Sequence, residues 1–432
     1  MLGAPIILVL TLLAALLAAG LWVGFSLIAV GFVSLSVFRD MPVGTFLAFD
    51  LWNSLNTPEL VALPLFILMG EILFHTRLSE SVFRGLSPWV TAVPGRLLHV
   101  NVIGCTLFAA VSGSSAATTA TIGRMTLTEL KSRGYDDELA MGSLCGAGTL
   151  GFLIPPSIIL ILYGVLSETS IIDLFIAGLI PGLILAISYM GYIAVRAVME
   201  PSLLPDEAGS TTWTMRVRAL VDLGPIFTLI AAVIASMYAG IASPSEAAVV
   251  GVTGALIIGA CQNSLNRESM TQAFLGAVKT CSMIGLIVAG ALFISKAMAF
   301  LGLPQAVANA IGSLDLSPFV LIILLTVFYI VLGCIIDGLS AIVMTLALVL
   351  PLITSAGFDQ VWFGIFLVIV VEMSQITPPV GFNLFVVQGL TGAPIGRIAR
   401  ASLPFFFIMV AFVILINAVP EIVTFLPQSM SK

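Results

Sequence analysis

The chain has 432 residues, of which 59% are hydrophobic and only 9% are charged, and its formal net charge is −6. A soluble domain carries about 25% charged residues, so no water-soluble fold could hide so much apolar surface, and lipid is expected to be the main solvent. The basic residues are scattered, which excludes the clustered basic face of a nucleic-acid-binding protein. The five cysteines lie singly and there are only two histidines, so no transition-metal site is expected.

Apolar stretches predict the membrane spans. A helix needs about 20 apolar residues to cross about 30 Å of hydrocarbon. Stretches that could cross lie at 3–19, 22–38, 60–75, 139–166, 171–195, 223–239, 246–261, 283–300, 361–390 and 403–426. The first has neither a basic segment before it nor a clear cleavage site after it, which predicts a retained span rather than a signal peptide.

Two further apolar stretches, 97–123 and 319–353, are interrupted near their middle. The first is split at Ser112–Ser115 and the second at Asp337 and Gly338. Each limb is expected to have about 15 residues, or about 22 Å of helix, which is too short to cross. Both stretches are therefore predicted to be re-entrant helical hairpins that enter and leave on the same face.

The basic residues support this topology. If the hairpins do not cross, Arg39, Lys296 and Lys432 lie on one side of the membrane. The other side receives Arg77, Arg84, Arg96, Arg124, Lys131, Arg133, Arg196, Arg216, Arg218, Arg267, Lys279, Arg397 and Arg400. Cytoplasmic loops carry an excess of Lys and Arg, so the second side is predicted to be cytoplasmic and both termini to face outward.

The two halves of the chain form an internal repeat. Pro155-Pro156 and Pro378-Pro379 match at an offset of 223 residues, and the same offset brings the two hairpin breaks close together. Five crossings separate the hairpins, and an odd number inverts the second copy. The sequence therefore predicts the inverted-topology repeats that are typical of secondary transporters.

The repeat divides the chain into six segments. These are N-terminal scaffold helices (1–96), a first hairpin and broken-helix transport unit (97–195), a cytoplasmic linker (196–222), second-half scaffold helices (223–318), a second hairpin and broken-helix transport unit (319–402) and a C-terminal span (403–432). The predicted fold class is an all-α polytopic membrane protein with scaffold and transport domains.

Helix breaks at membrane depth mark the candidate site, because such breaks are costly unless they line a polar cavity. They fall at Ser112–Ser115 with Thr118 and Thr119, at Gly148–Pro156, at Asp337–Ser340 and at Glu372–Asn383. Freed carbonyls together with side-chain oxygens are the usual sodium ligands in transporters of this type. Half-helix N-termini at the hairpin tips present free N–H groups that suit a carboxylate.

Two acidic residues lie within these breaks, where an ionisable group is expensive and usually functional. Asp337 either helps to bind a cation or caps a helix at the hairpin turn. Glu372 either serves the site or fastens the broken helix. The hydroxyl residues of the first hairpin could instead be small residues that allow close helix packing.

The motifs resemble one known family. The segments are VSGSSAATTATIGRM (111–125), GYDDELA (134–140), GTLGFLIPPSI (148–158), GIASPSEAAVVG (240–251), DGLSAIVMT (337–345) and QITPPVGFN (375–383). Together they resemble the large, DctM-type subunit of the tripartite ATP-independent periplasmic (TRAP) transporters. The resemblance covers essentially the whole chain, and no departure removes a motif.

The resemblance implies a sodium-driven importer in a bacterial inner membrane, with both termini periplasmic, that moves a transport domain against a scaffold like an elevator. It implies a carboxylate substrate, such as a C4-dicarboxylate, sialic acid or a sugar acid. It also implies two partners, a periplasmic DctP-type binding protein and a small four-helix DctQ-type membrane subunit. Because this chain starts at the first span, the small subunit is expected to be a separate polypeptide. No enzymatic activity is implied, and sodium is the only ion or cofactor expected.

Site residues follow from the same resemblance. In the first half, the sodium ligands would be Ser112, Gly113, Ser114, Ser115, Gly148, Thr149 and Pro155. In the second half, they would be Asp337, Gly338, Gln375, Thr377 and Pro378. Substrate would lie between the hairpin tips, near Ser114, Ser115, Thr118, Thr119, Pro156, Ser340, Pro379 and Asn383.

Three alternatives stay open. A stand-alone sodium- or proton-coupled dicarboxylate carrier could have the same inverted hairpins and need no binding protein. An intramembrane enzyme could use a serine of Ser112–Ser115 as its nucleophile, but it would need a base within hydrogen-bond reach, and no histidine or lysine is evident there. A passive channel is disfavoured by paired hairpins that can close the path.

Overall fold

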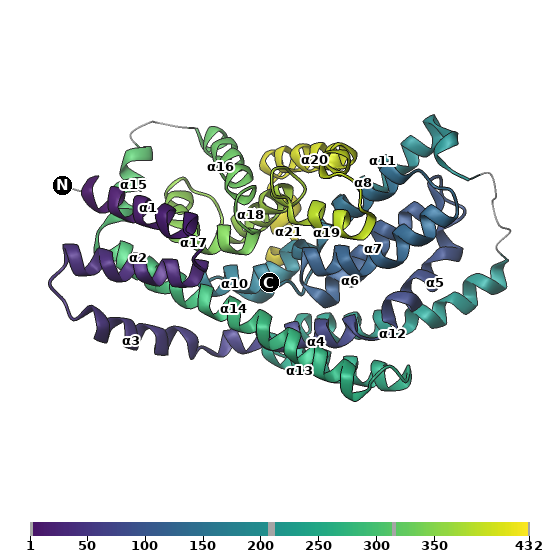
Figure 1. The fold of residues 1–432 in the computed structure, drawn as a ribbon, viewed down its shortest axis with the longest axis horizontal. Coiled ribbons are helices and arrows are strands. Elements are labelled where there is room, and N and C mark those ends of the chain that lie inside the picture. Colours follow the sequence, from purple (N-terminus) through teal and green to yellow (C-terminus); the bar gives the residue numbers. More distant parts are fainter. Residues whose placement is uncertain (1–2, 206–211, 313–316, 431–432) are drawn as a thin grey trace.

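The computed structural model describes residues 3–205, 212–312 and 317–430, and within these ranges the chain is helical without strands (Figure 1). The first half contains α1 (Gly3–Ala18), α2 (Val23–Phe38), α3 (Val43–Leu55), α4 (Ala62–Phe74), α5 (Leu78–Val90), α6 (His99–Ser112), α7 (Ser115–Ser132), α8 (Asp137–Gly148), α9 (Leu150–Leu153), α10 (Ile158–Ser167) and α11 (Ile171–Met199). The second half contains α12 (Trp213–Tyr238), α13 (Pro244–Cys261), α14 (Arg267–Phe300), α15 (Leu303–Gly312), α16 (Pro318–Gly333), α17 (Gly338–Ser355), α18 (Gln360–Gln375), α19 (Phe382–Thr391), α20 (Ile395–Ala418) and α21 (Glu421–Met430). Short 3-10 turns lie at Pro58–Val61, Arg96–Leu98 and Pro201–Leu203.

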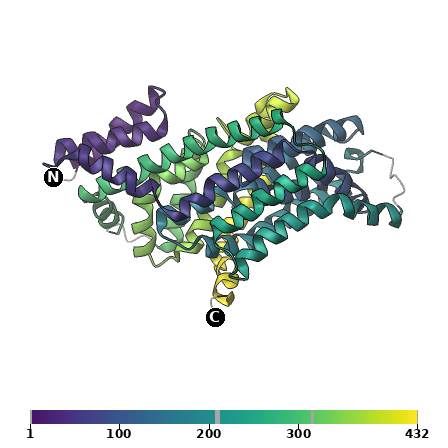
Figure 2. The same ribbon diagram turned by 90° about the horizontal axis from the view of Figure 1, so that it is seen from below.

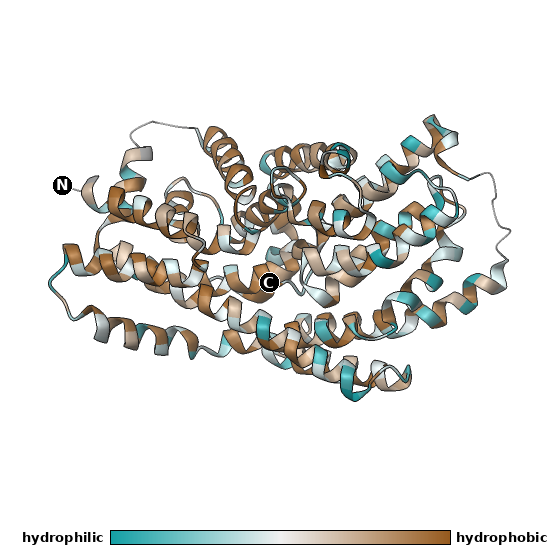
Figure 3. Cartoon of the chain, viewed as in Figure 1, coloured by the Kyte–Doolittle hydropathy of each residue, from teal (hydrophilic) through white to brown (hydrophobic). Residues whose placement is uncertain are grey.

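Many of these helices can cross a membrane. Within the described ranges, seven stretches are long and apolar enough, or eight if α3 and α4, which meet at a bend of 59°, form one span. Six of the predicted spans fall on such stretches: 139–166, 171–195, 223–239, 246–261, 283–300 and 403–426. Figure 3 shows hydrophobic residues over most of the length of these helices. The chain is therefore a multi-pass membrane protein.

Several helices were not predicted. Helices α3, α5 and α15 are short and lie outside the predicted apolar stretches, and the stretch at 403–426 is divided between α20 and the separate helix α21. The predicted linker at 196–222 is also partly helical, because α11 continues to Met199 and α12 begins at Trp213. Helix α14 begins at Arg267, well before the apolar stretch at 283–300. Hydropathy locates the part of a helix that lipid can surround, but it misses the polar ends that extend beyond it.

The hairpin limbs differ from the predicted length of about 15 residues. Helices α6 and α16 have 14 and 16 residues, but α7 and α17 have 18 each. An 18-residue helix is about 27 Å long, and α17 is apolar enough to count among the possible spans. The predicted limb length was therefore wrong for α7 and α17, and length and composition alone would allow α17 to cross.

The helices form two groups. One group contains α2, α4, α5, α12, α13 and α14. In it, α14 packs along α2 and α4, α13 packs against α4, and α12 packs against α5 and α13. Figure 2 shows these long helices side by side. In the other group, α6 packs against α7 and α8, α20 against α8, and α18 against α16 and α17. Helix α19 of the second half packs against α7 of the first hairpin, which brings residues of both halves together.

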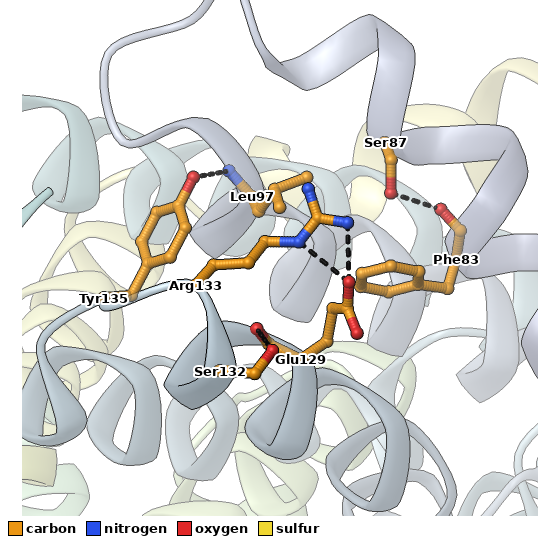
Figure 4. A network of polar contacts seen from close by, with 7 residues as sticks. All are labelled: Phe83, Ser87, Leu97, Glu129, Ser132, Arg133 and Tyr135. Carbon is orange, nitrogen blue, oxygen red and sulfur yellow. Dashed lines mark hydrogen bonds and ion pairs between the residues drawn. The ribbon is translucent and has the colours of Figure 1, made fainter. Parts of the chain in front are cut away.

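Polar contacts fix the ends of these helices. Lys296 of α14 forms an ion pair with Asp50 of α3, whose side chain is only 2% exposed. At the far end of α7, Arg133 donates hydrogen bonds to Glu129 (Figure 4). Next to this pair, the Leu97 N–H donates to the Tyr135 hydroxyl at 3.4 Å. The base of the first hairpin is thereby tied to the turn that precedes α6.

The repeat is visible in how the helices begin. Ser114 caps α7 by accepting a hydrogen bond from the Ala117 N–H, and Asp337 caps α17 by accepting one from the Ser340 N–H. Asp136 and Asp359 cap α8 and α18 in the same way. Both pairs are separated by the offset of 223 residues found in the sequence. Capping satisfies N–H groups that would otherwise lack a partner, so both halves begin the second limb of the hairpin, and the helix that follows it, by the same device.

Candidate functional site

The tip of the first hairpin lies against the broken helix of its own half. Gly113 ends α6 with a φ of 59°, in the left-handed region that favours glycine. A Cβ atom on Gly113 would lie 3.0 Å from the Pro156 carbonyl oxygen, and the Ile158 N–H donates to the Gly113 carbonyl at 3.4 Å. The hairpin tip and the Pro155-Pro156 break therefore form one closely packed unit.

Ser115, at the start of α7, is the centre of a buried polar cluster. Its Oγ atom lies 3.0 Å from the Gly148 carbonyl oxygen and 3.0 Å from Glu372 Oε2. Asn383 contacts the same atom through Oδ1 at 3.3 Å and Nδ2 at 2.9 Å. All three side chains are at most 1% exposed. The cluster combines residues from both breaks of the first half with two residues from the Glu372–Asn383 break of the second half, so it joins the two repeats.

Glu372 links this cluster to the first broken helix. Its Oε1 atom accepts a hydrogen bond from the Phe152 N–H at 3.1 Å, while its Oε2 atom faces Ser115. Of the two roles left open for Glu372, fastening the broken helix is visible in these contacts. The residue was not among the predicted ligands, although its place inside an apolar span was the signal that could have included it.

The other hydroxyl residues of the first hairpin and of the first broken helix contact each other or the backbone. Ser112 Oγ and Thr118 Oγ1 lie 2.7 Å apart. Thr119 donates to the Ser115 carbonyl at 2.9 Å. Thr149 turns away from the tip, since it donates to the Gly146 carbonyl at 2.6 Å and contacts the Tyr189 hydroxyl at 3.3 Å. Of these residues, the structure places Thr119 nearest to the Ser115 cluster, through its bond to the Ser115 backbone.

The second hairpin has a different arrangement. Asp337 is half-buried, and its Oδ2 atom accepts a hydrogen bond from the Ser340 N–H at 3.0 Å. A Cβ atom on Gly338 would lie 3.2 Å from Gln375 Nε2, so the hairpin tip contacts the broken helix here as well. Thr377 donates to the Met373 carbonyl at 2.7 Å. The capping role of Asp337 is therefore present in the structure.

The two halves differ in how far their paired prolines are exposed. Pro155 and Pro156 are buried, whereas Pro378 and Pro379 are exposed. The Ser340 hydroxyl is fully buried, and its oxygen has no hydrogen-bond partner within the described residues. The Pro-Pro break of the first half is thus covered by protein, whereas that of the second half lies at the surface.

Known proteins resemble the chain over its length. The family model for the tripartite ATP-independent periplasmic transporter, DctM component, matches residues 10–422. A C4-dicarboxylate TRAP transporter large permease protein of Pseudomonas aeruginosa is 32% identical, over 88% of this chain and 89% of that protein. The sialic acid TRAP transporter large permease protein of Vibrio cholerae is 28% identical, over 96% of each chain. An ectoine/5-hydroxyectoine TRAP transporter large permease protein of Ruegeria pomeroyi is 30% identical, over 95% of this chain and 93% of that one.

Solved structures show the same fold in more distant transporters. The YdaH transporter of Alcanivorax borkumensis superimposes with a TM-score of 0.56 at 16% identity, over 88% of this chain and 89% of that chain. The Neisseria gonorrhoeae protein MtrF gives a TM-score of 0.56 at 13% identity, over 86% and 83%. At such identities the likeness concerns the fold alone. The match along nearly the whole sequence decides the family: the chain belongs to the DctM components of the tripartite ATP-independent periplasmic transporters, and it is a transporter permease rather than an enzyme.

Proposed function

We propose that this chain is the large permease subunit of a sodium-coupled importer of small organic anions. The observation that carries the proposal is the buried cluster around Ser115, where oxygens from a hairpin, a broken helix and the opposite half of the chain converge. Oxygen ligands at helix breaks are how transporters with inverted repeats hold their coupling cation. The second candidate set comprises Asp337, Gly338, Gln375, Thr377 and Pro378.

The substrate class follows from the helix N-termini at the two hairpin tips. Helices α7 and α17 both begin at a tip, so their first N–H groups and positive dipole ends favour an anion. The relatives are named for C4-dicarboxylates, sialic acid and ectoine, and each of these compounds carries a carboxylate. A carboxylate, including that of a sugar acid, is therefore the group we expect between the tips.

The movement would take place between the two groups of helices. The hairpins and broken helices share one group, and the long helices α12, α13 and α14 belong to the other. Sliding of the first group against the second would carry a closed site across the bilayer as an elevator does. This division is the proposed counterpart of the scaffold and transport segments predicted from the sequence.

The family is tripartite by name, so two partners are proposed for this chain. A DctP-type periplasmic protein would bind the substrate and deliver it, and a small DctQ-type subunit would accompany the permease in the inner membrane. The excess of basic residues on one side supports an orientation with periplasmic termini. The runner-up function is a stand-alone sodium- or proton-coupled carrier that needs no binding protein.

Uptake into proteoliposomes tests the proposal. The purified chain is reconstituted with its small subunit and supplied with its binding protein and radiolabelled succinate, sialic acid or gluconate. We expect accumulation of one of these anions only under an inward sodium gradient and only with the binding protein present. Equal uptake in potassium would contradict sodium coupling, and uptake without the binding protein would favour the stand-alone carrier.

A further inference from the structure

Glu372 is a buried acid without a basic partner. Its side chain is 1% exposed in the middle of the molecule, and none of the ion pairs among the described residues includes it. Its neighbours are the Ser115 hydroxyl and the Phe152 N–H. A carboxylate buried at membrane depth needs a compensating positive charge, or else it takes up a proton, because two neutral hydrogen bonds do not replace its lost hydration. A bound cation would supply that charge.

The hydrogen atoms near Ser115 are too few for the oxygens. Ser115 Oγ carries one hydrogen, yet it lies within 3.3 Å of three acceptors: the Gly148 carbonyl oxygen, Glu372 Oε2 and Asn383 Oδ1. The amide of Asn383 can donate to Ser115 Oγ through Nδ2 at 2.9 Å, but this bond adds no hydrogen for the other oxygens. One hydroxyl hydrogen can satisfy only one of them. The surplus of acceptors is what a cation site requires.

The spacing of these oxygens suits a small cation. Hard ions of about this size bind oxygen at about 2.3–2.6 Å, as calcium does. Two ligands at right angles around such an ion lie roughly 3.2–3.7 Å apart. Ser115 Oγ is 3.0 Å from Gly148 O, 3.0 Å from Glu372 Oε2 and 3.3 Å from Asn383 Oδ1. Each of these three distances is within a few tenths of an ångström of the spacing between neighbouring ligands of such an ion.

The charge at this site has no counterpart in the other half. At the repeat offset of 223 residues, Glu372 corresponds to Thr149 and Ser115 corresponds to Gly338. Thr149 contacts Gly146 and Tyr189 and has no carboxylate to offer. Duplication alone does not produce the contact between Glu372 and Ser115. The second half supplies an acid to the hairpin of the first half, whose tip at Ser112–Ser115 offers only hydroxyl side chains.

We propose that Glu372 is the anionic ligand of a sodium ion that Ser115 Oγ, the Gly148 carbonyl oxygen and Asn383 Oδ1 also bind. The proposal rests on the sodium coupling proposed above and adds the residue that neutralises the ion. Because its ligands come from both halves, the occupied site ties α18 and α19 to the first hairpin. Loss of the ion leaves an unpaired carboxylate at the same place and loosens that tie.

The test compares Glu372→Gln with the wild-type chain by sodium-dependent thermal unfolding in detergent and by binding of ²²Na⁺. Sodium chloride is varied against potassium chloride at constant ionic strength and pH. A ligand that binds only the folded protein raises its stability with occupancy. We expect the sodium concentration for half-maximal stabilisation to rise roughly tenfold or more in Glu372→Gln, because ligand charge sets the affinity for hard cations. Glu71→Gln, which changes a partly buried acid of α4, is the matched control and should stay within about twofold of the wild type.

The outcomes separate this proposal from the function it rests on. Equal sodium responses of Glu372→Gln and the wild type would overturn the role of Glu372 and leave sodium coupling intact. Failure of sodium to bind or stabilise the wild-type chain would contradict sodium coupling itself, and this assignment with it. Sodium-driven uptake by the complete transporter distinguishes these two cases.

A second variant covers the possibility that Glu372→Gln does not fold. Glu372→Asp keeps the charge but withdraws the carboxylate by one carbon–carbon bond from Ser115. We expect it to bind sodium more weakly than the wild type and more strongly than Glu372→Gln. An unchanged sodium requirement in Glu372→Asp would also overturn the assignment, because a direct ligand cannot move that far without loss of affinity.

Discussion

Gly148 occupies a position where the fold leaves no space for a side chain. A Cβ atom there would lie 1.8 Å from Thr119 Oγ1 and 3.2 Å from Asn383 Nδ2. The Gly148 carbonyl can approach Ser115 because nothing larger than hydrogen stands on its α-carbon. Glycine is therefore needed here for close packing, and its φ lies outside the left-handed region.

We expect Gly148→Ala to destabilise the protein by about 1–3 kcal/mol, as overpacked interiors do. The added methyl group must displace Thr119 and with it the bond to the Ser115 backbone. Thermal unfolding in detergent measures the change. Gly389→Ala is the control, because a Cβ atom on Gly389 would meet nothing within 4 Å.

A rescue variant sharpens this test. Thr119→Ala removes the nearest clashing atom, so the double variant Gly148→Ala/Thr119→Ala should recover part of the lost stability. Equal stability of Gly148→Ala and Gly389→Ala would contradict the claim that α8 packs against α7 too closely at Gly148 to admit a methyl group.

At the scale of single residues, the sequence indicated several of the residues that the structure brings together, but not all of their contacts. Ser115 and Gly148 were predicted near sodium and Asn383 near the substrate, and the structure brings all three together. The partner of Ser115 on α18, Glu372, lies 257 residues away in the chain. The repeat predicts contacts between each hairpin and the broken helix of its own half. It does not predict a contact between the two halves, such as that of Ser115 with Glu372.

At the scale of secondary-structure elements, the cap of α17 combines two possible roles of Asp337. Its carboxylate accepts a hydrogen bond from the Ser340 N–H, and it is also a candidate cation ligand. Asparagine keeps an oxygen that can cap the helix but removes the charge, whereas alanine removes both. The two substitutions therefore separate the roles.

We expect Asp337→Ala to lower the stability in potassium by about 0.5–2 kcal/mol through loss of the cap. Asp337→Asn should keep the stability in potassium within about 0.5 kcal/mol of the wild type and weaken the additional stabilisation by sodium. Thermal unfolding in the two salts measures both effects. Asp359→Asn is the control, since Asp359 caps α18 through the Trp362 N–H at 2.8 Å and lies outside the helix breaks.

Equal losses of stability in potassium for Asp337→Ala and Asp337→Asn would show that the carboxylate charge, rather than the cap, stabilises α17. An unchanged sodium response in Asp337→Asn would remove Asp337 from the cation ligands. Each result assigns one role without reference to the other.

Secondary-structure elements were predictable where the membrane environment restricts the backbone to a few arrangements. Long apolar stretches, paired prolines and glycine-serine turns predicted the spans and breaks, because lipid permits no unpaired backbone between them. Helix α5 was missed because it is amphipathic, with Glu80 and Arg84 on a helix of 13 residues. Its stability comes from packing against α12 and α6, and such tertiary contacts are not encoded in local hydropathy.

At the scale of the whole molecule, the inverted repeat predicts opposite sidedness for matching positions. Lys131 near the end of α7 and Thr354 near the end of α17 are separated by the repeat offset, and both are exposed. If the hairpins are re-entrant and inverted, Lys131 faces the cytoplasm and Thr354 faces the periplasm.

We expect a membrane-impermeant maleimide to label Thr354→Cys in intact spheroplasts and Lys131→Cys only after lysis. Both substitutions are made in a chain without its five native cysteines, because Cys261 is exposed and Cys281 is partly exposed. Labelling is read by the shift in mass or fluorescence of the purified protein. Labelling of both positions from the same side would contradict the inversion, and it would require one hairpin to cross.

Helix α14 runs for 34 residues without a proline, which corresponds to about 51 Å. The hydrocarbon layer is only about 30 Å thick, so α14 must tilt or extend among the lipid headgroups. Its C-terminal part is held to α3 by the ion pair between Lys296 and Asp50. A change in acyl-chain length therefore alters the tilt of α14 and α3 together, which makes the mechanics of this permease depend on the thickness of the bilayer that surrounds it.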